Sequence, residues 1–526
     1  MNMNRQRSLE IRIEALCVVG LLLAALLLFG INLGGLPLRD WDEGTVAQVA
    51  REISERGDFQ GLLFPTLGGK PYLKPPLVHG LIALTYALAG VNEWTTRLPG
   101  ALLTAVSVPL LYGIGREIFP RRRSALFSAL TYLTLLPVVR HGRLAMLDGA
   151  VLCFAILMFW CILKCRRDLR WSLGVGLSFG ALCLTKGMMG LLLGAIALLF
   201  IAWDTPRLLT SVYLWLGVIC GSIPVIAWYA AQWIHYREAF VTTGIFDQSL
   251  ERIWTPVEGH LGPKWYYLWE LLKNGWSWLL FSLYGLHLAW CHRNWSWAKL
   301  ILVWSGVYFL AVSLMATKLP WYIMPIYPPL ALAVGGVLAE VFHWPSNRSY
   351  PRIWSIWSIF LAVTAMIGCL YFGFSETTDR SLVVILGTIS LTMGVVEVLI
   401  ERKDAQFIAV MFWGMYIALL LFFLSPHWIW ELNEAYPVKP VAAMIKFGVP
   451  QNQVVYTNFD YARPSLDFYS EHRVIPASTE EIQRYWRSSE PYLLLEADIM
   501  EQLRPLESAR IICTAPPNWV LIAKDR

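Results

Sequence analysis

The chain has 526 residues, of which 56% are hydrophobic and only 15% are charged. Soluble domains are about 45–50% apolar and about 25% charged, so the composition excludes a water-soluble enzyme of this size and indicates a polytopic membrane protein. The 43 Lys and Arg residues against 37 Asp and Glu residues leave a formal net charge of +6, too weak an excess to indicate nucleic acid as a partner.

The first apolar run covers residues 13–33 and follows Arg5, Arg7 and Arg12. It is about 20 residues long, which is enough to cross a bilayer and longer than the apolar core of a signal peptide. The run ends in Gly34-Gly35 without a small-residue cleavage site. It predicts a retained first membrane helix with its N-terminus in the cytoplasm.

Further apolar stretches are candidates for membrane spans. They cover roughly residues 97–118, 123–140, 144–164, 171–185, 187–203, 208–231, 267–290, 298–316, 320–342, 352–374, 381–400 and 406–425. A shorter stretch, 76–91, begins with two prolines and is expected to lie half-buried at the interface, because this choice keeps most Lys and Arg residues in cytoplasmic loops. The sequence therefore predicts an all-α polytopic membrane protein with thirteen spans.

Three segments then face the outside. Two of them, 34–96 and 232–266, are loops of a membrane domain that covers residues 1–425. The third, 426–526, has shorter apolar runs and more charge, which predicts a small external α/β domain. Its predicted strands are Val454–Asn458, Tyr492–Leu495 and Trp519–Lys524, and its predicted helices are Ser478–Ser488 and Ile499–Leu506.

Three acids, Asp40, Asp42 and Glu43, open the first external segment. The residues that follow have apolar side chains at helical spacing and predict a helix on the membrane that ends near Gly57. Asp42 stands where an N-cap belongs, which is the plainer interpretation of one acid. Three acids beside a membrane are costly unless they are used, so they are also candidates for catalysis.

Basic residues recur at the same external face. Lys74 precedes the half-buried stretch, Lys186 and Lys318 lie in short hairpins between spans, and Arg143 with Asp148 opens another span. Each lysine alone also fits a side chain that snorkels to the interface. Together the cations form a candidate cradle for an anion such as phosphate, with acids beside it.

The external position restricts the chemistry. Soluble nucleotide donors are not expected outside a cytoplasmic membrane, so a synthetic enzyme there needs an activated group that a lipid delivers. A sugar linked to a lipid phosphate meets this need, because cations stabilise the departing phosphate and a carboxylate accepts the proton of the acceptor hydroxyl. A transporter would place charges near the bilayer midplane, whereas the spans between 187 and 425 are nearly free of charge in their middles.

An ordered set of motifs over about residues 10–345 carries a family resemblance. The set comprises Asp40-Trp41-Asp42-Glu43-Gly44, Ala50-Arg51-Glu52 with Gly57-Asp58, Lys74-Pro75-Pro76-Leu77, Arg143 with Asp148, Lys186-Gly187, and Lys318 with Tyr322 and Pro325. The chain thereby resembles the GT-C glycosyltransferases. The branch it resembles most contains the lipid A aminoarabinose transferases and the dolichyl-phosphate-mannose-protein mannosyltransferase-like proteins.

The resemblance implies thirteen helices, a periplasmic active site on the inner membrane and a polyprenyl-phosphate-linked sugar donor. Together with the charges described above, it gives Asp42, Asp148 and Glu43 as the catalytic candidates. The candidates for contact with the donor phosphate are Lys74, Lys318, Tyr322, Arg143, Lys186 and Arg252. Two further site candidates, on the acceptor side or elsewhere, are Asp40 and Arg463.

Two positions depart from the aminoarabinose branch, whose members usually have Arg two residues after the Asp-Glu pair and Glu immediately before the Lys-Pro-Pro lysine. This chain has Thr45 and Leu73 there. Without that Glu we expect no zinc site of the aminoarabinose kind, and the nine cysteines show no zinc-ligand spacing. No cofactor is predicted, and dependence on a divalent metal stays open. His260 alone is more typical of a surface or packed histidine. The departures leave the sugar and the acceptor open.

The predicted function is transfer of a sugar from a polyprenyl-phosphate-linked donor to a lipid or glycan acceptor of the envelope. The membrane lipids are further expected partners. Two alternatives stay open. One is a protein O-glycosyltransferase that uses the same class of donor. The other is a transporter of lipid-linked substrates, in which the external charges form a docking ring.

Overall fold

The computed structural model describes residues 2–257, 259–345, 348–375, 378–430, 437–488, 491–502 and 509–524. The chain divides into two compact units. One, here called the helical unit, comprises Met1–Leu33, Leu73–Val78 and Leu98–Trp428. The other, here called the mixed unit, comprises Gly34–Tyr72, His79–Arg97 and Ile429–Arg526.

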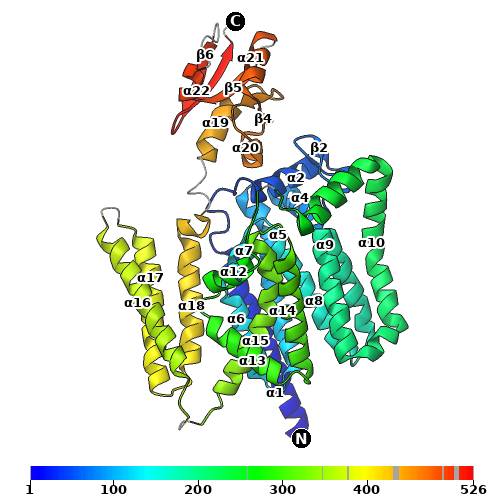
Figure 1. Cartoon of the computed structure of the whole chain (residues 1–526), viewed down its shortest axis with the longest axis vertical. Coiled ribbons are helices and arrows are strands. Elements are labelled where there is room, and N and C mark those ends of the chain that lie inside the picture. Colours follow the sequence, from blue (N-terminus) through cyan, green and yellow to red (C-terminus); the bar gives the residue numbers. More distant parts are fainter. Residues whose placement is uncertain are drawn as a thin grey trace. The chain divides into compact units, whose positions relative to one another are not determined.

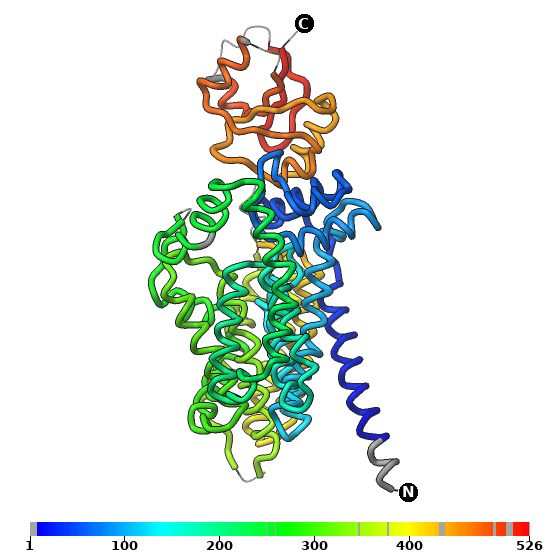
Figure 2. Tube along the Cα trace, turned by 90° about the vertical axis from the view of Figure 1, so that its right-hand side faces the viewer, coloured from blue at the N-terminus to red at the C-terminus, as the bar shows by residue number. Residues whose placement is uncertain are grey.

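Most helices of the helical unit run along a common direction (Figure 1, Figure 2). The longer ones are α1 (Asn2–Gly30), α5 (Glu93–Ile118), α6 (Arg122–Leu133), α8 (Asp148–Cys165), α9 (Ser172–Asp204), α10 (Val212–Tyr236), α13 (Leu279–Cys291), α14 (Ser296–Leu314), α15 (Tyr327–Val341), α16 (Arg352–Phe374), α17 (Arg380–Glu401) and α18 (Phe407–Leu424). The short helical segments are α7 (Leu136–Arg143), η1 (Leu169–Trp171), η2 (Pro206–Thr210), η3 (Phe240–Leu250), α11 (Glu251–Trp254), α12 (Tyr266–Asn274), η4 (Pro320–Ile326) and η5 (Pro426–Trp428).

In the described chain, ten helices are long and apolar enough to cross a membrane. A fold-back inside α9 makes two crossings out of one of them. The shorter α6 and α13 overlap the predicted spans 123–140 and 267–290. These segments correspond in position to the thirteen predicted spans, and the prediction of a helical, multi-pass membrane protein is confirmed.

The fold-back occurs at Lys186, whose φ of −150° and ψ of 69° are not helical. A Cβ on Gly190 would lie 2.8 Å from the backbone nitrogen of Cys183, and one on Gly194 would lie 2.5 Å from the ring of Phe179. Residues 179 and 194 would be roughly 22 Å apart along a straight helix, so the two halves of α9 must pack against each other. The two predicted spans 171–185 and 187–203 are therefore an antiparallel pair with Lys186 at the turn.

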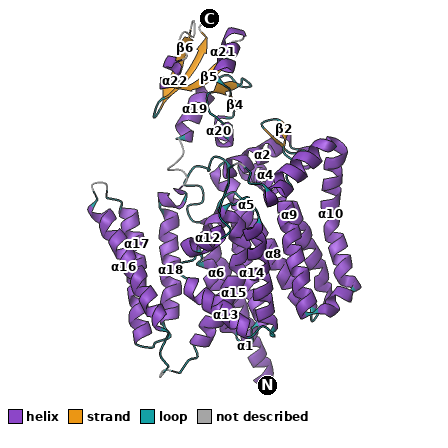
Figure 3. Ribbon diagram, in the orientation of Figure 1, coloured by secondary structure: helices purple, strands orange, loops and turns teal. Residues whose placement is uncertain are grey.

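All strands of the described chain lie in the mixed unit (Figure 3). Its N-terminal part contains α2 (Asp42–Arg56), α3 (Phe59–Leu63), β1 (Thr66–Leu67), β2 (Lys70–Pro71) and most of α4 (Leu77–Ala89). Its C-terminal part contains α19 (Val438–Gly448), β3 (Val455–Thr457), α20 (Pro464–Ser470), β4 (Val474–Pro476), α21 (Thr479–Ser488), β5 (Tyr492–Glu496), α22 (Ala497–Gln502), β6 (Ala509–Ala515) and β7 (Trp519–Lys524).

The C-terminal part is a five-stranded sheet in the order β4-β3-β5-β7-β6 with helices on both faces. Strands β4, β3 and β5 are parallel, and β7 is antiparallel to both of its neighbours. Because side chains alternate along a strand, Leu494 packs in the core with α19, whereas Leu493 and Leu495 pack on the other face with Ile482 and Trp486 of α21. The prediction of a small α/β region is confirmed.

Most of the first external segment, residues 34–72 and 79–96, belongs to the mixed unit together with the C-terminal part. A Cβ on Gly44 of α2 would lie 2.6 Å from the backbone nitrogen of Ser465 in α20, so the two helices touch backbone to backbone. Helix α2 ends, as predicted, at Gly57, whose φ of 66° favours glycine. The predicted helix 499–506 corresponds to α22 as far as Gln502, and its last residues lie outside the described chain.

Candidate functional site

Lys186 and Asp148 form an ion pair inside the helical unit. The ammonium Nζ lies 3.0 Å from Asp148 Oδ1, and the Asp148 side chain is only 5% exposed. Asp148 is the first residue of α8, and Lys186 lies at the turn of α9. The turn thus brings together two predicted site residues that are 38 positions apart.

Tyr322 and Arg252 extend this pair to a group of four. Lys186 Nζ lies 5.4 Å from the ring centroid of Tyr322, and Arg252 Nη1 lies 3.4 Å from the Tyr322 hydroxyl oxygen. The hydroxyl of Tyr308 donates to the Tyr322 carbonyl at 2.6 Å and holds this part of η4 in place. We call Asp148, Lys186, Arg252 and Tyr322 the polar cluster.

Backbone pairing between two loops places Arg252 beside Tyr322. The amides of Ala316 and Thr317 donate to the carbonyls of Ile253 and Arg252 at 2.8 Å and 3.2 Å. The amide of Lys318 donates to the carbonyl of His260 at 3.1 Å. The segment before η4 therefore caps the carbonyls of the short helix α11, which contains Arg252.

Lys318 is buried, and its ammonium faces the C-terminal end of α14. It donates to the carbonyls of Ser313 at 2.8 Å and Val312 at 3.2 Å, and it lies 5.2 Å from the ring centroid of Tyr267. Burial lowers the pKa of Lys318. A cation at this helix end also complements the helix dipole. These contacts give Lys318 a structural role, and its contact with a donor phosphate remains a prediction.

Arg143 is fully buried at the end of α1. Its guanidinium donates to the carbonyls of Leu28 at 2.6 Å and Ile31 at 2.5 Å, and it stacks on the rings of Phe423 and Trp428. These contacts join α7 to α1 and to the end of α18. They fit a structural role better than contact with a phosphate, and Arg143 shares none of the contacts that define the polar cluster.

Lys74 is half-buried in the segment Leu73–Val78, which belongs to the helical unit. A Cβ on Gly244 would lie 3.2 Å from the Leu73 side chain, so the π-helix η3 packs beside this segment. π-Helical turns are frequent at functional sites. The predicted contact of Lys74 with a phosphate remains a prediction.

The three acids of the mixed unit occupy different surroundings. Glu43 is fully buried, and both of its oxygens accept from the guanidinium of Arg97 at 2.8 Å. Arg97 also donates to the carbonyls of Leu36 and Pro37, so the Glu43–Arg97 pair fixes the loop before α2. Glu43 therefore fits a structural role better than a catalytic one.

Asp40 is also held by partners within the mixed unit. It accepts from Arg463 at 3.0 Å and from the hydroxyl of Ser465 at 2.6 Å, so the two predicted residues Asp40 and Arg463 do meet. The Arg463 guanidinium also lies over the rings of Phe459 and Tyr461. The pair fastens the segment before α2 to the segment before α20.

Asp42 is the most accessible of the three acids. It is the first residue of α2, whose N-cap is Trp41 and has no side-chain cap. Its carboxylate lies 3.2 Å from Arg39 Nη2, and its side chain is 27% exposed. The plainer interpretation of Asp42 as an N-cap is therefore not what the structure shows.

Sequence reasoning missed three residues that the structure makes prominent: Arg97, Tyr308 and Glu270. Arg97 and Tyr308 lie within predicted spans, and only their packing identifies them as partners of Glu43 and Tyr322. Glu270 is a buried acid on α12 and is considered below. Within the described residues, no group of three or more His, Cys, Asp or Glu side chains is placed to hold a metal ion.

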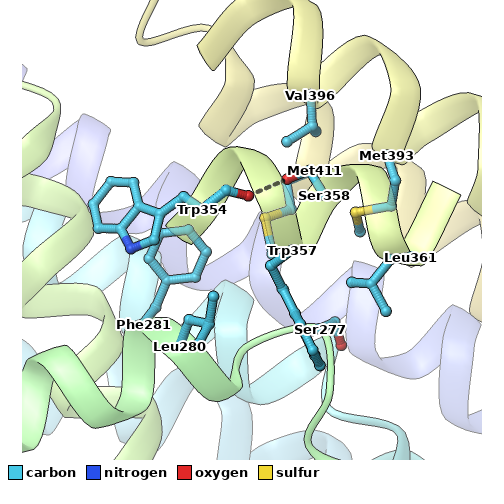
Figure 4. Close-up of a pocket in the computed structure, with 10 residues that line it drawn as sticks. All are labelled: Ser277, Leu280, Phe281, Trp354, Trp357, Ser358, Leu361, Met393, Val396 and Met411. Carbon is cyan, nitrogen blue, oxygen red and sulfur yellow. Dashed lines mark hydrogen bonds between the residues drawn. The ribbon is translucent and has the colours of Figure 1, made fainter. Parts of the chain in front are cut away.

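A pocket between α13, α16, α17 and α18 lies in a different environment (Figure 4). It is lined by apolar side chains such as Phe281, Trp354, Met393 and Met411. The hydroxyl of Ser358 is used within α16, where it donates to the Trp354 carbonyl at 2.9 Å. This pocket therefore contributes no charged group to the candidate site.

Comparison with known proteins agrees with the motifs. Residues 73–230 match the family described as dolichyl-phosphate-mannose-protein mannosyltransferase. The chain is 30% identical over 308 residues to undecaprenyl phosphate-alpha-4-amino-4-deoxy-L-arabinose arabinosyl transferase 1 of Pseudomonas fluorescens, which is 57% of this chain and 55% of that protein. It is 30% identical over 319 residues to the corresponding transferase of Pectobacterium carotovorum, or 58% and 56% of the two chains. The matches thus span little more than half the length of these relatives.

Solved structures match over nearly the whole chain. The structure of ArnT from Cupriavidus metallidurans bound to undecaprenyl phosphate has a TM-score of 0.78 and 21% identity and covers 96% of this chain and 97% of its own. The archaeal oligosaccharyltransferase AglB from Archaeoglobus fulgidus has a TM-score of 0.54 and 10% identity, with 93% and 70% covered. The chain is thus similar in sequence to the aminoarabinose transferases, as the motifs indicated, and it has the fold of these two solved structures.

Proposed function

We propose that the chain is an integral glycosyltransferase of the inner membrane. On the external face of the membrane, it transfers a sugar from a polyprenyl-phosphate-linked donor to a lipid or glycan acceptor of the envelope. The observation that carries this proposal is the polar cluster, in which the cations Lys186 and Arg252 lie against Tyr322 and Lys186 pairs with a buried acid. The names of the relatives, which act on undecaprenyl phosphate-linked aminoarabinose, support the class of donor.

The polar cluster fits the departure of a phosphate. Lys186 and Arg252 supply positive charge where the leaving phosphate gains negative charge, and Tyr322 supplies a hydroxyl as hydrogen-bond donor. Asp148 accepts from Lys186 at 3.0 Å and so fixes the position of the ammonium group. Asp148 thus acts as a positioning residue, and Lys74 and Lys318 complete the phosphate site in this proposal.

Asp42 is the proposed general base that accepts the proton of an acceptor hydroxyl. Its side chain is 27% exposed, whereas Glu43 is saturated by Arg97. Attack on the sugar opposite the phosphate would invert the anomeric centre. The domain proposal keeps residues 1–425 as the catalytic membrane domain and 426–526 as an external domain.

A reconstituted transfer assay tests the proposal. Labelled polyprenyl-phosphate sugars and envelope extract are supplied to the wild type, to Asp42→Asn and to Glu55→Gln, an exposed acid on the same helix as a matched control. We expect label on a lipid or glycan with the wild type and Glu55→Gln, and a loss of about 10²–10⁴-fold in kcat with Asp42→Asn.

Other outcomes would replace the proposal. Label on serine or threonine would identify a protein O-glycosyltransferase. Movement of the carrier lipid across the bilayer with no new glycosidic bond would identify a transporter. Turnover of Asp42→Asn within about threefold of the wild type would exclude a general base at this position.

A further inference from the structure

The predicted span 267–290 is a broken helix. It consists of α12 (Tyr266–Asn274) and α13 (Leu279–Cys291), with a break at 275–278. On α12, Leu268, Trp269 and Leu272 are exposed, whereas Tyr267 and Glu270 are buried. Helix α12 therefore turns an apolar face outward and a polar face, spaced by one turn, into the helical unit.

Glu270 is a buried acid that the polar cluster does not use. It is only 5% exposed, and its Oε2 accepts from the side-chain amide of Asn274 at 2.8 Å. Across the part of the chain that the structure describes, Glu270 forms no ion pair. A buried carboxylate without a counter-charge is costly, so its retention at this position needs a reason beyond packing.

The hydroxyl of Tyr327 is a second unmatched polar group nearby. Tyr327 is 1% exposed, and within the described residues its hydroxyl has no hydrogen-bond partner. Tyr327 directly follows η4, and α12, which carries Glu270, packs against η4. A buried hydroxyl without a partner destabilises the folded state. A buried carboxylate without a counter-charge and a buried hydroxyl without a partner thus lie on adjoining segments of the helical unit.

Tyr267 links these groups to the proposed phosphate site. Its ring centroid lies 5.2 Å from Lys318 Nζ, and its hydroxyl donates to the carbonyl of Leu319 at 3.2 Å. Glu270 follows Tyr267 by three residues, which is about 4.5 Å along the helix axis. Tyr322 of the polar cluster lies in η4, which begins directly after Leu319 and packs against α12. Glu270 therefore lies close to the site proposed for the donor but carries the same sign of charge as a phosphate.

We infer that Glu270 and Tyr327 form a subsite for the sugar of the lipid-linked donor, where the carboxylate accepts hydrogen bonds from an ammonium or hydroxyl group of that sugar. A phosphate would be repelled by Glu270, and a polyprenyl tail has no hydrogen-bond donor to offer. The sugar is the part of the donor that supplies such groups next to the phosphate. This subsite rests on the proposed class of donor, and it makes Glu270 a residue that determines sugar specificity.

The test compares binding of carrier lipids with and without a sugar. The probes are bare undecaprenyl phosphate, the same carrier with 4-amino-4-deoxy-L-arabinose, and its counterpart with a hydroxyl in place of the amine. The proteins are the full-length wild type, Glu270→Gln, Tyr327→Phe and, as a matched control, Glu397→Gln, a half-buried acid on α17. Affinity is measured in detergent with each probe.

We expect the wild type and Glu397→Gln to bind at least one sugar-linked carrier about tenfold or more tightly than the bare carrier. Glu270→Gln should reduce that preference to threefold or less while the affinity for the bare carrier stays within threefold of the wild type. Tyr327→Phe, which keeps the ring, should reduce the preference in the same direction. A preference for the amino sugar alone identifies an ammonium ligand, and an equal preference for both sugars identifies a hydroxyl.

Three results would overturn the inference: no preference for either sugar in the wild type, an unchanged preference in Glu270→Gln, or a parallel loss of affinity for the bare carrier. The last result would assign Glu270 to the structure of the site as a whole. Because binding is measured without turnover, failure of the transfer assay would remove the proposed function while a preserved sugar preference would leave the subsite standing.

Discussion

Lys186, at the turn of α9, forms an ion pair with Asp148, the first residue of α8, with 3.0 Å between Nζ and Oδ1. Asp148 is buried, so the pair holds the lysine in place among largely apolar helices. The same ammonium lies against the ring of Tyr322. The pair thus connects the turn of α9 with η4, which contains Tyr322.

The ion pair predicts coupled losses of activity. Lys186→Met removes the proposed phosphate contact and should lower kcat about 100-fold, while Asp148→Asn leaves the lysine unrestrained and should lower kcat about 10-fold or more. The double variant should be no worse than Lys186→Met, because the two residues act as one unit. Steady-state transfer kinetics check this expectation.

The matched control for this cycle is Lys164→Met, since Lys164 pairs with Glu117 near the other end of α8 at 2.8 Å. Its kcat should stay within twofold of the wild type. Losses that simply add in the double variant would show that Lys186 and Asp148 act independently.

Arg143 offers a direct test of structure against phosphate binding. Arg143→Lys cannot make both hydrogen bonds to Leu28 and Ile31 or stack in the same way on Phe423, so we expect a loss of roughly 3 kcal/mol in the free energy of unfolding. Thermal unfolding in detergent measures it. Affinity for bare undecaprenyl phosphate should be unchanged in the folded fraction. If the variant has normal stability but loses this affinity, Arg143 contacts the donor phosphate, as the sequence predicted.

The Glu43–Arg97 pair predicts a large effect on stability. Both side chains are fully buried, and Glu43→Gln leaves the Arg97 guanidinium without its counter-charge. We expect a loss of about 3–5 kcal/mol in the free energy of unfolding. Glu55→Gln breaks the exposed ion pair with Arg51 on the same helix and should cost less than about 1 kcal/mol. Equal stabilities of the two variants would contradict the structural role of Glu43.

The sequence predicts those features that depend on local signals. The turn at Lys186 follows from Thr185-Lys186-Gly187 between two apolar runs, and strand β7 follows from an uninterrupted apolar stretch at Trp519–Lys524. Strands β4 and β6 were not predicted, since β4 ends in a proline, Pro476, and β6 is irregular between Ile511 and Cys513. A proline in a short run argues against a strand, and an irregular strand shows no clear alternation.

Which of two roles a charged residue takes depends on contacts far away in sequence. Arg143 has the same spacing to Asp148 whether it binds a phosphate or the end of α1, and only packing with Leu28 separates the two. Glu43 is separated from Arg97 by 54 positions, and Arg97 lies at the start of a predicted membrane span, where no local pattern marks it as the partner of Glu43. Local patterns therefore predicted where the charges gather but not which of them are already satisfied.

Asp467 predicts how the stability of the mixed unit depends on pH. Burial, and to a lesser extent the charges of Glu52 and Asp40, raise the pKa of this carboxyl to about 7, against the opposing effects of the Val474 amide and of Arg473. The folded state therefore binds the proton more tightly than the unfolded state, so the stabilisation is complete below about pH 4 and is lost as the pH rises through 7. Between pH 5 and pH 8 this group should lower the free energy of unfolding of the wild type by about 3 kcal/mol. Asp467→Asn keeps an oxygen for the Val474 amide and cannot ionise, so its unfolding temperature relative to the wild type should rise from pH 5 to pH 8.

Asp460→Asn, a control on the exposed loop before α20, should follow the wild type at both pH values. A constant difference between Asp467→Asn and the wild type across this range would show that Asp467 is already ionised in the folded protein at pH 5.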